Sequence, residues 1–208
     1  MSFKPFKITK IQIHSQAELL EGLKKVVMLK DREARPYAQA SLSVTTLPWS
    51  EVRPAQRYAL VDGLAKVHCL EWELAKEGLD LFNLDGYLTI WTDQSSPPID
   101  LLPPIVETIE EADGSLVNII NDGLHRMYVA RLEWKQPKIV LARNIPREYP
   151  YYAYPIVGEN PWDSIVLVEG ETIPAGLIKK WHRQEDNKLL YRDFNSAFQN
   201  VGGPRGQG

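Results

Sequence analysis

Apolar residues near the start of the chain change from a strand spacing to a helical spacing. In residues 7–14, KITKIQIH, Ile11 and Ile13 alternate with polar side chains, which predicts a β-strand. Ser15 and Glu18 then have the spacing of a capping box. Apolar residues with a helical period follow at Leu19, Leu20, Leu23, Val26 and Val27. The pattern predicts a strand followed at once by an amphipathic helix.

The next region predicts a break and then a second helix. The periodicity is lost over residues 31–49, which favours a long loop or an extended arm. Pro54 is well placed as the first residue of a helix, and Gly78 can end it. The apolar stripe of this predicted helix consists of Leu60, Leu64, Val67 and Leu74.

The middle of the chain predicts a hairpin that leads into a helix. Residues 86–92, GYLTIWT, read as one strand, and two further strand-like runs meet at Asp113 and Gly114, a strong hairpin signal. The second run, 116–120, leads directly to residues 121–130, NDGLHRMYVA. Helix formers follow, and another strand is expected over 138–145. The apolar residues available for packing in this helix are Met127, Ala130, Leu132 and Trp134.

The C-terminal part combines an irregular stretch with one more predicted helix. Residues 147–155, REYPYYAYP, are rich in Tyr and Pro and are expected to be irregular. A helix is expected over 188–200, and residues 202–208 are expected to be a disordered tail. Together the elements predict an α+β fold, with a mixed sheet, flanking helices, an N-terminal helical elaboration and a C-terminal helix.

Length and composition limit the function classes. The 208 residues carry a net charge of −3, which argues against a chain that coats nucleic acid electrostatically. The single cysteine, Cys69, cannot form an internal disulfide, and no run reaches the roughly 18 apolar residues of a membrane span. We therefore expect a cytoplasmic protein without membrane partners. The four histidines, His14, His68, His125 and His182, are far apart in sequence, which argues against a zinc site.

Basic residues gather near the C-terminus despite the acidic balance. They are Lys179, Lys180, Arg183, Lys188 and Arg192. Such a run is usually a solvated face, but it could bind an acidic protein partner or a phosphate backbone.

The junction between the predicted hairpin and helix is the strongest candidate site. A helix N-terminus carries about half a positive charge and unpaired amides, so it favours anions. Gly123 has no side chain to block the approach of a ligand. His125 and Arg126 fall in the first helical turn, where cations are unfavourable unless an anion offsets them. This arrangement predicts a phosphate site, in which Arg126 binds oxygens and His125 donates a hydrogen bond or moves a proton.

Several roles remain open for these side chains. Asp122 could be the helix N-cap, could hold Mg²⁺ beside a nucleotide phosphate, or could act as a base toward a hydroxyl group. Alternatively, His125 and Arg126 could be exposed and form a salt bridge with one of three nearby acids. These acids are Glu107, Glu110 and Glu111.

The same residues resemble a motif of the ParB/sulfiredoxin-like superfamily. Members carry Gly-x-His-Arg or Asp-Gly-His-His-Arg at the start of a helix that binds nucleotide phosphates, and residues 122–126, DGLHR, resemble this motif. Residues 104–106 resemble the superfamily's Pro-Ile-Val strand. The resemblance covers about residues 80–145 and implies a core at 81–145, with an N-terminal elaboration at 1–80 and a C-terminal extension at 146–201 packed on the core.

Differences from the superfamily members narrow the implied function. Sulfiredoxins have their catalytic cysteine where this chain has Leu124, so the resemblance excludes that route. Chromosome-partition ParB proteins bind CTP but carry a helix-turn-helix domain, which we do not find. The free amino-acid kinases match the motif best, although Leu124 replaces their first histidine.

The resemblance implies a nucleotide-binding protein, either an NTPase or a phosphotransferase acting on a small acceptor. ATP, ADP or CTP would bind with Mg²⁺, with Gly123, His125 and Arg126 at the phosphates and with Asp122 and His125 as catalytic groups. The alternative is a module that keeps the anion pocket but only binds nucleic acid or protein. A DNA nuclease is a weaker alternative, because no carboxylate cluster with metal spacing accompanies the motif.

Overall fold

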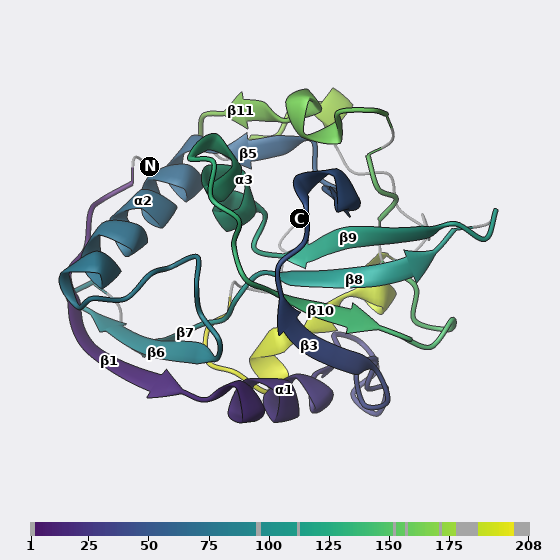
Figure 1. Ribbon diagram of the computed structural model, residues 1–208, viewed down its shortest axis with the longest axis horizontal. Helices are drawn as coiled ribbons and strands as arrows, with labels where there is room; N and C mark the ends of the chain where they lie inside the picture. Colours follow the sequence, from purple (N-terminus) through teal and green to yellow (C-terminus); the bar gives the residue numbers. More distant parts are fainter. Residues whose placement is uncertain are drawn as a thin grey trace.

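The computed structural model describes residues 3–94, 97–111, 113–151, 153–156, 158–170, 172–177 and 187–201. Over these residues the α+β fold is confirmed (Figure 1). The α-helices are α1 (Gln16–Lys24), α2 (Val61–Lys76) and α3 (Leu124–Leu132). Short 3-10 helices cover Trp49–Glu51, Pro161–Ser164, Ala175–Leu177, Asn187–Leu190 and Phe194–Ser196. None of the described helices has both the length and the apolar character that crossing a bilayer requires.

A mixed five-stranded sheet carries the predicted junction. Its strands, in spatial order, are β3 (Ser41–Thr45), β10 (Ile139–Arg143), β8 (Ile105–Glu110), β9 (Leu116–Asp122) and β4 (Val52–Arg53). β8 and β9 form the predicted antiparallel hairpin, whose turn contains Gly114 at φ 82°. β10 runs parallel to β8 and antiparallel to β3. The predicted strands at 86–92 and 138–145 are also confirmed.

Three smaller sheets connect segments that are distant in sequence. The strands β1 (Ile8–His14), β6 (Tyr87–Thr92) and β7 (Ile99–Leu101) form an antiparallel sheet. The strand β5 (Tyr58–Leu60) runs parallel to β11 (Val166–Val168), and β2 (Val27–Met28) pairs with β12 (Arg192–Asp193). The C-terminal segment is thus tied to the first 30 residues.

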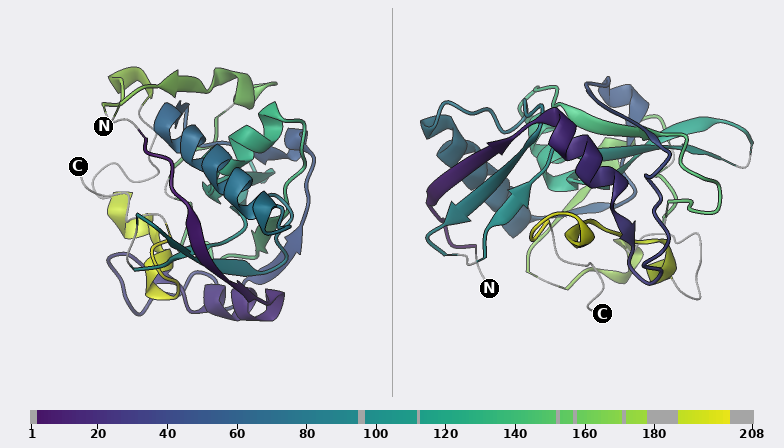
Figure 2. Two further views of the ribbon diagram at one scale, coloured as in Figure 1. Left: turned by 90° about the vertical axis from the view of Figure 1, so that its left-hand side faces the viewer. Right: turned by 90° about the horizontal axis from the view of Figure 1, so that it is seen from below.

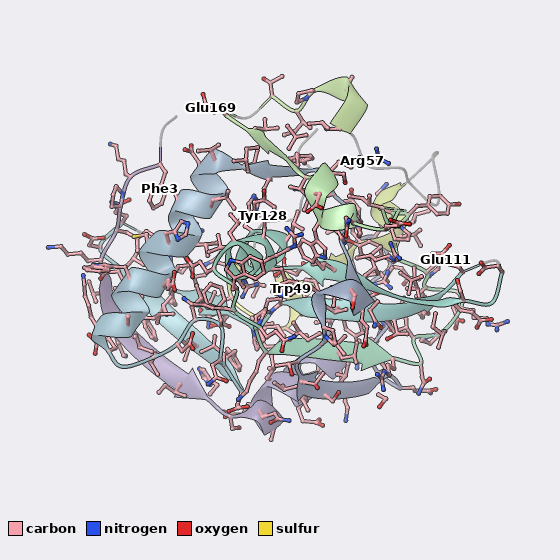
Figure 3. The ribbon with its side chains drawn as sticks, turned by 45° about the horizontal axis from the view of Figure 1, so that its top comes forward. Phe3, Trp49, Arg57, Glu111, Tyr128 and Glu169 are labelled. Atoms are coloured by element: carbon pink, nitrogen blue, oxygen red, sulfur yellow. The ribbon has the colours of Figure 1, made fainter. Side chains whose placement is uncertain are left out.

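The β1–β6–β7 sheet separates two parts of the core because successive side chains of a strand face opposite sides. Leu88 and Ile90 pack in the cluster that contains α2, whereas Tyr87 contacts Phe198 of the C-terminal segment. Figure 2 shows α2 and the C-terminal segment, in yellow, on opposite sides of β1. Trp49 and Tyr128, a residue of α3, also pack against the first cluster, and both are labelled in Figure 3.

Local signals correctly predicted the start of α1 and the end of α2. Ser15 and Glu18 form the predicted capping box at the start of α1. Gly78 adopts a positive φ of 71° just after α2 and accounts for its end. The predicted first strand is also confirmed, as β1.

Two predictions in the N-terminal region are wrong. Pro54 does not begin a helix, because residues 58–60 pair with β11 and α2 starts only at Val61. The stretch 31–49 is not only a loop, because it contains β3, which pairs with β10 along its length. Both errors reflect pairing with strands that lie about 100 residues away.

Two predictions further along the chain are also wrong. Instead of an α-helix over 188–200, two 3-10 helices flank β12. A helix would place Leu190 and Phe194 on one side, whereas the structure packs them in different clusters. In α3, Met127 and Ala130 are buried as expected, but two of the expected packing residues are not. Leu132 is 53% exposed and Trp134 is 95% exposed.

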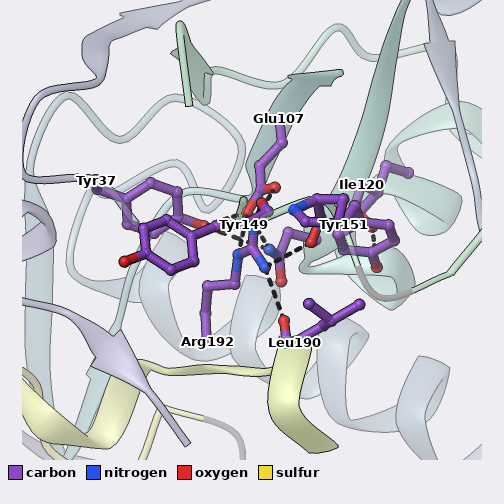
Figure 4. A network of polar contacts seen from close by, with 9 residues as sticks. Tyr37, Glu107, Ile120, Tyr149, Tyr151, Leu190 and Arg192 are labelled. Carbon is purple, nitrogen blue, oxygen red and sulfur yellow. Dashed lines mark hydrogen bonds and ion pairs between the residues drawn. The ribbon is translucent and has the colours of Figure 1, made fainter. Parts of the chain in front are cut away.

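A buried ion pair connects the C-terminal segment to the central hairpin (Figure 4). Arg192 and Glu107 are fully buried, and two parallel hydrogen bonds of 2.9 Å join the guanidinium to the carboxylate. Tyr37 donates to the same carboxylate at 2.5 Å, as does the amide of Asn121. Burial and the negative charge of Glu107 raise the pKa of Tyr37 well above its ordinary value, so it remains a neutral donor.

Backbone carbonyls complete the surroundings of Arg192. The carbonyl oxygens of Leu190, Pro150 and Tyr149 accept hydrogen bonds from its guanidinium at 2.7–3.0 Å. Arg192 thereby joins the Tyr/Pro segment, β12 and β8 in one network, which is one reason why the irregular segment 147–151 is held in place. The prediction that Arg192 belongs to an exposed basic face is wrong.

We predict that Arg192→Met lowers the free energy of unfolding by about 3–5 kcal/mol, because it leaves the Glu107 carboxylate buried and unpaired. Urea denaturation measures the change. Arg147→Met is the matched control, since Arg147 is 84% exposed and its pair with Glu110 is worth less than about 1 kcal/mol. The double variant Glu107→Leu, Arg192→Met should recover part of the loss. Equal effects of the Arg192 and Arg147 substitutions would contradict the assigned role.

Candidate functional site

A cavity of about 1000 Å³ lies beside the predicted junction. Its wall contains the junction residues 121–126, and α2 contributes Gly63, Lys66, Val67 and Leu70. These four positions repeat at helical spacing, so one face of α2 borders the cavity. The volume is of the order found for small-molecule and cofactor sites.

An irregularity in the hairpin shapes the end of β9. Ile105 pairs with Asp122, whereas Val106 pairs with Ile120, so Asn121 is an extra residue on β9. Such a bulge re-aims the neighbouring side chains. Asn121 contributes to the buried Glu107 network, and Asp122 contacts Arg126 of α3.

Gly123 is required at the start of α3 for two reasons. It is the N-cap and has φ 89°, a conformation that favours glycine. A Cβ atom at this position would lie 3.0 Å from Pro104 Cα and 2.9 Å from Arg126 Nη2. The space expected for a ligand is therefore occupied in part by the protein's own Pro104 and Arg126.

Asp122 is not the N-cap of α3, so this interpretation of the residue is wrong. Gly123 is the N-cap, and no side chain caps the helix. Asp122 accepts a hydrogen bond of 3.0 Å from Arg126, and both side chains are nearly buried, with exposures of 9% and 11%. Arg126 also donates to the carbonyl oxygen of Leu102. Asp122 and Leu102 thus hold the guanidinium at the cavity wall.

His125 joins the N-termini of α2 and α3. Its Nε2 accepts a hydrogen bond of 3.0 Å from the backbone N–H of Leu60, the N-cap of α2. Any hydrogen bond that His125 donates in this arrangement must therefore come from Nδ1. A Cβ atom at Gly63 would lie only 2.6 Å from His125 Nε2, so the two helices touch here. Two positive helix ends converge at the cavity.

Lys66 adds a second cation that the sequence did not single out. It lies at an exposed position of α2 that borders the cavity. Partial desolvation of its ammonium group, and then the charge of Arg126, lower the pKa of Lys66. Within the part of the chain that the structure describes, no carboxylate forms an ion pair with Lys66. No signal in the sequence connects it with Arg126, because the two residues are distant along the chain and meet only through helix packing.

Of the sequence predictions, the structure brings Asp122, Gly123, His125 and Arg126 to one cavity wall. None of the acids suggested as partners for Arg126 pairs with it in the described structure. Glu107 pairs with Arg192 and Glu110 with Arg147, whereas Arg126 pairs with Asp122.

Comparison with protein families gives one match. The family model described as ParB CE domain matches residues 18–166, from α1 to the start of β11. The chain belongs to the ParB CE domain family. The ParB-like assignment predicted from the DGLHR motif is thereby confirmed. Comparisons with curated proteins and with solved structures gave no match. The domain boundaries derived from the sequence stay predictions.

The basic C-terminal face of this ParB CE domain protein is only partly described. Arg192 is buried, as shown above. Lys179, Lys180 and Arg183 lie outside the described residues, as do the side chain of Lys188 and the predicted tail at 202–208.

A second cluster of polar groups lies between α2 and the end of α3. Ligand atoms of His68, Glu71 and Glu133 all lie within 4.8 Å of one another. The ammonium group of Lys135 forms ion pairs with both carboxylates. A cation of the protein itself therefore already offsets part of the negative charge of these acids, and we assign no metal to them.

We predict that Gly123→Ala destabilises the protein more than Gly114→Ala. Both glycines have positive φ, which costs an alanine about 1–2 kcal/mol, but nothing lies within 4 Å of a Cβ at Gly114. At Gly123 the contact with Pro104 adds strain, so we expect a further loss of about 1 kcal/mol or more. Urea denaturation of both variants measures the difference. Equal losses would show that the close approach to Pro104 has no energetic consequence.

Proposed function

We propose that this ParB CE domain protein binds a nucleotide through its phosphates, at the cavity wall formed by Gly123, Arg126 and Lys66. The convergence of two helix N-termini with these two cations carries the proposal. Each helix end favours negative charge, and a guanidinium and an ammonium add to this preference. Arg126 is already fixed by Asp122 and Leu102, which lowers the entropic cost of ordering it around a ligand.

The rest of the cavity supports a nucleotide over a free phosphate ion. Beyond Lys66 its wall becomes apolar along α2, at Val67 and Leu70, and Phe3 and Phe6 lie on the same wall. Phe3 is labelled beside α2 in Figure 3. A volume of about 1000 Å³ accommodates a base and sugar as well as phosphates. Apolar and aromatic surfaces are suited to the faces of a base.

A bound Mg²⁺ would neutralise phosphate charge and polarise the phosphoryl group. Asp122 fits a role as its ligand if its carboxylate is shared between the metal and Arg126, since a carboxylate accepts about four hydrogen bonds or metal contacts. In NTP hydrolysis or transfer to a small acceptor, Asp122 would hold the metal or the acceptor. His125 would act through Nδ1, because its Nε2 accepts from Leu60. Turnover and a cytoplasmic location stay predictions.

The alternative is a module that binds nucleic acid or protein through a basic C-terminal face. This face loses Arg192, whose charge is buried against Glu107. The nuclease alternative gains no support from the His68 cluster, whose acids pair with Lys135. The nucleotide proposal therefore accounts for more of the described residues.

We predict that Mg²⁺ with ATP, ADP or CTP raises the melting temperature of the protein. At a ligand concentration about 100 times Kd, binding adds about 2.7 kcal/mol of stability. For a domain of this size, that corresponds to about 5–10 °C. Differential scanning fluorimetry measures the shift, and Arg126→Ala should abolish it because the guanidinium contacts the phosphates.

Two further variants make this experiment decisive. Arg131→Ala, on the same helix, removes a cation that pairs with Asp163 outside the cavity wall and should retain the full shift. Because Arg126→Ala removes the cation beside the nearly buried carboxylate of Asp122, the double variant Asp122→Asn, Arg126→Ala provides a comparison without that negative charge. The absence of a shift with every nucleotide, or an undiminished shift in both Arg126 variants, would refute the proposal.

A further inference from the structure

We infer that Lys66 and Arg126 form a two-cation clamp that selects a terminal phosphate, a monoester or the end of a polyphosphate, over a phosphodiester. The inference rests on the proposed function and specifies its ligand. It assigns a binding role to Lys66, which lies about 60 residues before the motif.

The packing of α2 against α3 brings the two cations to one wall. Gly63 contacts His125, and Lys66 lies one helical turn further along the same face of α2. Arg126 follows His125 directly, and its guanidinium is fixed by Asp122 and Leu102. The Lys66 stem can move, so its ammonium can reach an anion held at Arg126.

The described charged residues around the cavity leave a net positive charge. Arg126 is balanced by Asp122, and two other wall residues, Arg192 and Asp193, are balanced by partners outside the cavity wall. Among the residues that the structure describes, the remaining charged ones of the wall are Lys4, Lys66 and Asp100, which together leave one positive charge. The ends of α2 and α3 add about half a charge each.

The resulting charge of about +2 matches a phosphate dianion. A monoester carries a charge of about −1.5 to −2 near neutral pH, whereas each phosphate of a diester carries only −1. A monoester also presents three terminal oxygens, so one phosphate can contact Arg126, Lys66 and the helix amides together. A diester has only two such oxygens. Binding of the dianion also relieves the repulsion between Lys66 and Arg126, which is, after desolvation, the second cause of the lowered pKa of Lys66 in the ligand-free protein.

Pairs of nucleotides with the same base and sugar but different phosphate charge isolate the effect of that charge on binding. Isothermal titration calorimetry at about pH 7.5, where a monoester with a second pKa of about 6 is mostly a dianion, compares 5′-AMP with 3′,5′-cyclic AMP and 5′-CMP with 3′,5′-cyclic CMP. We predict that the wild-type protein binds the monoester at least about tenfold more tightly in the preferred pair, because one charge-assisted hydrogen bond is worth that much. Lys66→Met should weaken monoester binding about tenfold and change cyclic nucleotide binding by less than about twofold.

The control variants test whether the clamp depends on this particular charge. Lys66→Arg retains a cation and should keep most of the preference for monoesters. Lys25→Met removes an exposed charge at the end of α1, outside the cavity wall, and should leave both affinities unchanged.

The possible failures are distinguishable. If Lys66→Met keeps the wild-type ratio of monoester to cyclic nucleotide while Arg126 variants lose nucleotide binding, the clamp is wrong and the proposed function stands. If the wild-type protein binds cyclic nucleotides as tightly as monoesters, the clamp is also wrong. If it binds none of the four nucleotides and shows no shift with ATP, ADP or CTP, both proposals fail.

Discussion

A charge buried in a protein needs a partner of opposite charge, and the fully buried pair of Glu107 and Arg192 meets this requirement. The positions of several segments depend on this ion pair. Glu107 lies on β8, next to the strand that delivers the chain to the candidate site, while Arg192 comes from the C-terminal segment. Tyr37 and Asn121 contact the same carboxylate, so four distant segments depend on one network. Because Asn121 is the bulged residue just before Asp122, this network also fixes where β9 ends and where α3 begins.

From that fixed end, short-range contacts build the cavity wall at which we propose phosphate binding. Gly123 turns the chain into α3 beneath Pro104, and Asp122 holds Arg126 against it. His125 accepts a hydrogen bond from the backbone N–H of Leu60, the N-cap of α2, which brings a second helix N-terminus and Lys66 to the same cavity. The two helix N-termini and the two cations at this wall support the proposed anion site. The packing of α2 against α3 determines which cations, Lys66 and Arg126, lie at this site.

Local sequence signals were reliable where the chain satisfies its own backbone. The capping box of Ser15 and Glu18, the glycine after α2 and the hairpin turn at Gly114 all depend on residues within a few positions of one another. Local signals gave wrong predictions where a segment forms hydrogen bonds with a strand that is distant in sequence. The predicted helix does not begin at Pro54, because residues 58–60 form a strand that pairs with β11. Arg192 does not lie in the predicted helix, because its backbone pairs with that of Met28 and its side chain forms an ion pair with Glu107.

The sequence by itself determined the α+β fold, because periodicity and turn chemistry are local properties, and the resemblance of residues 122–126 to a known motif indicated the ParB-like family. A missed signal was also present, since Leu42 and Val44 alternate with serines and threonine in β3. Only the tertiary structure decided the roles of these residues. It made Asp122 the partner of Arg126 instead of a helix cap, directed His125 Nε2 to α2, buried Arg192 and added Lys66 to the site. The physical reason is that charges act through space, so a residue's electrostatic partner depends on packing between elements and not on separation along the chain.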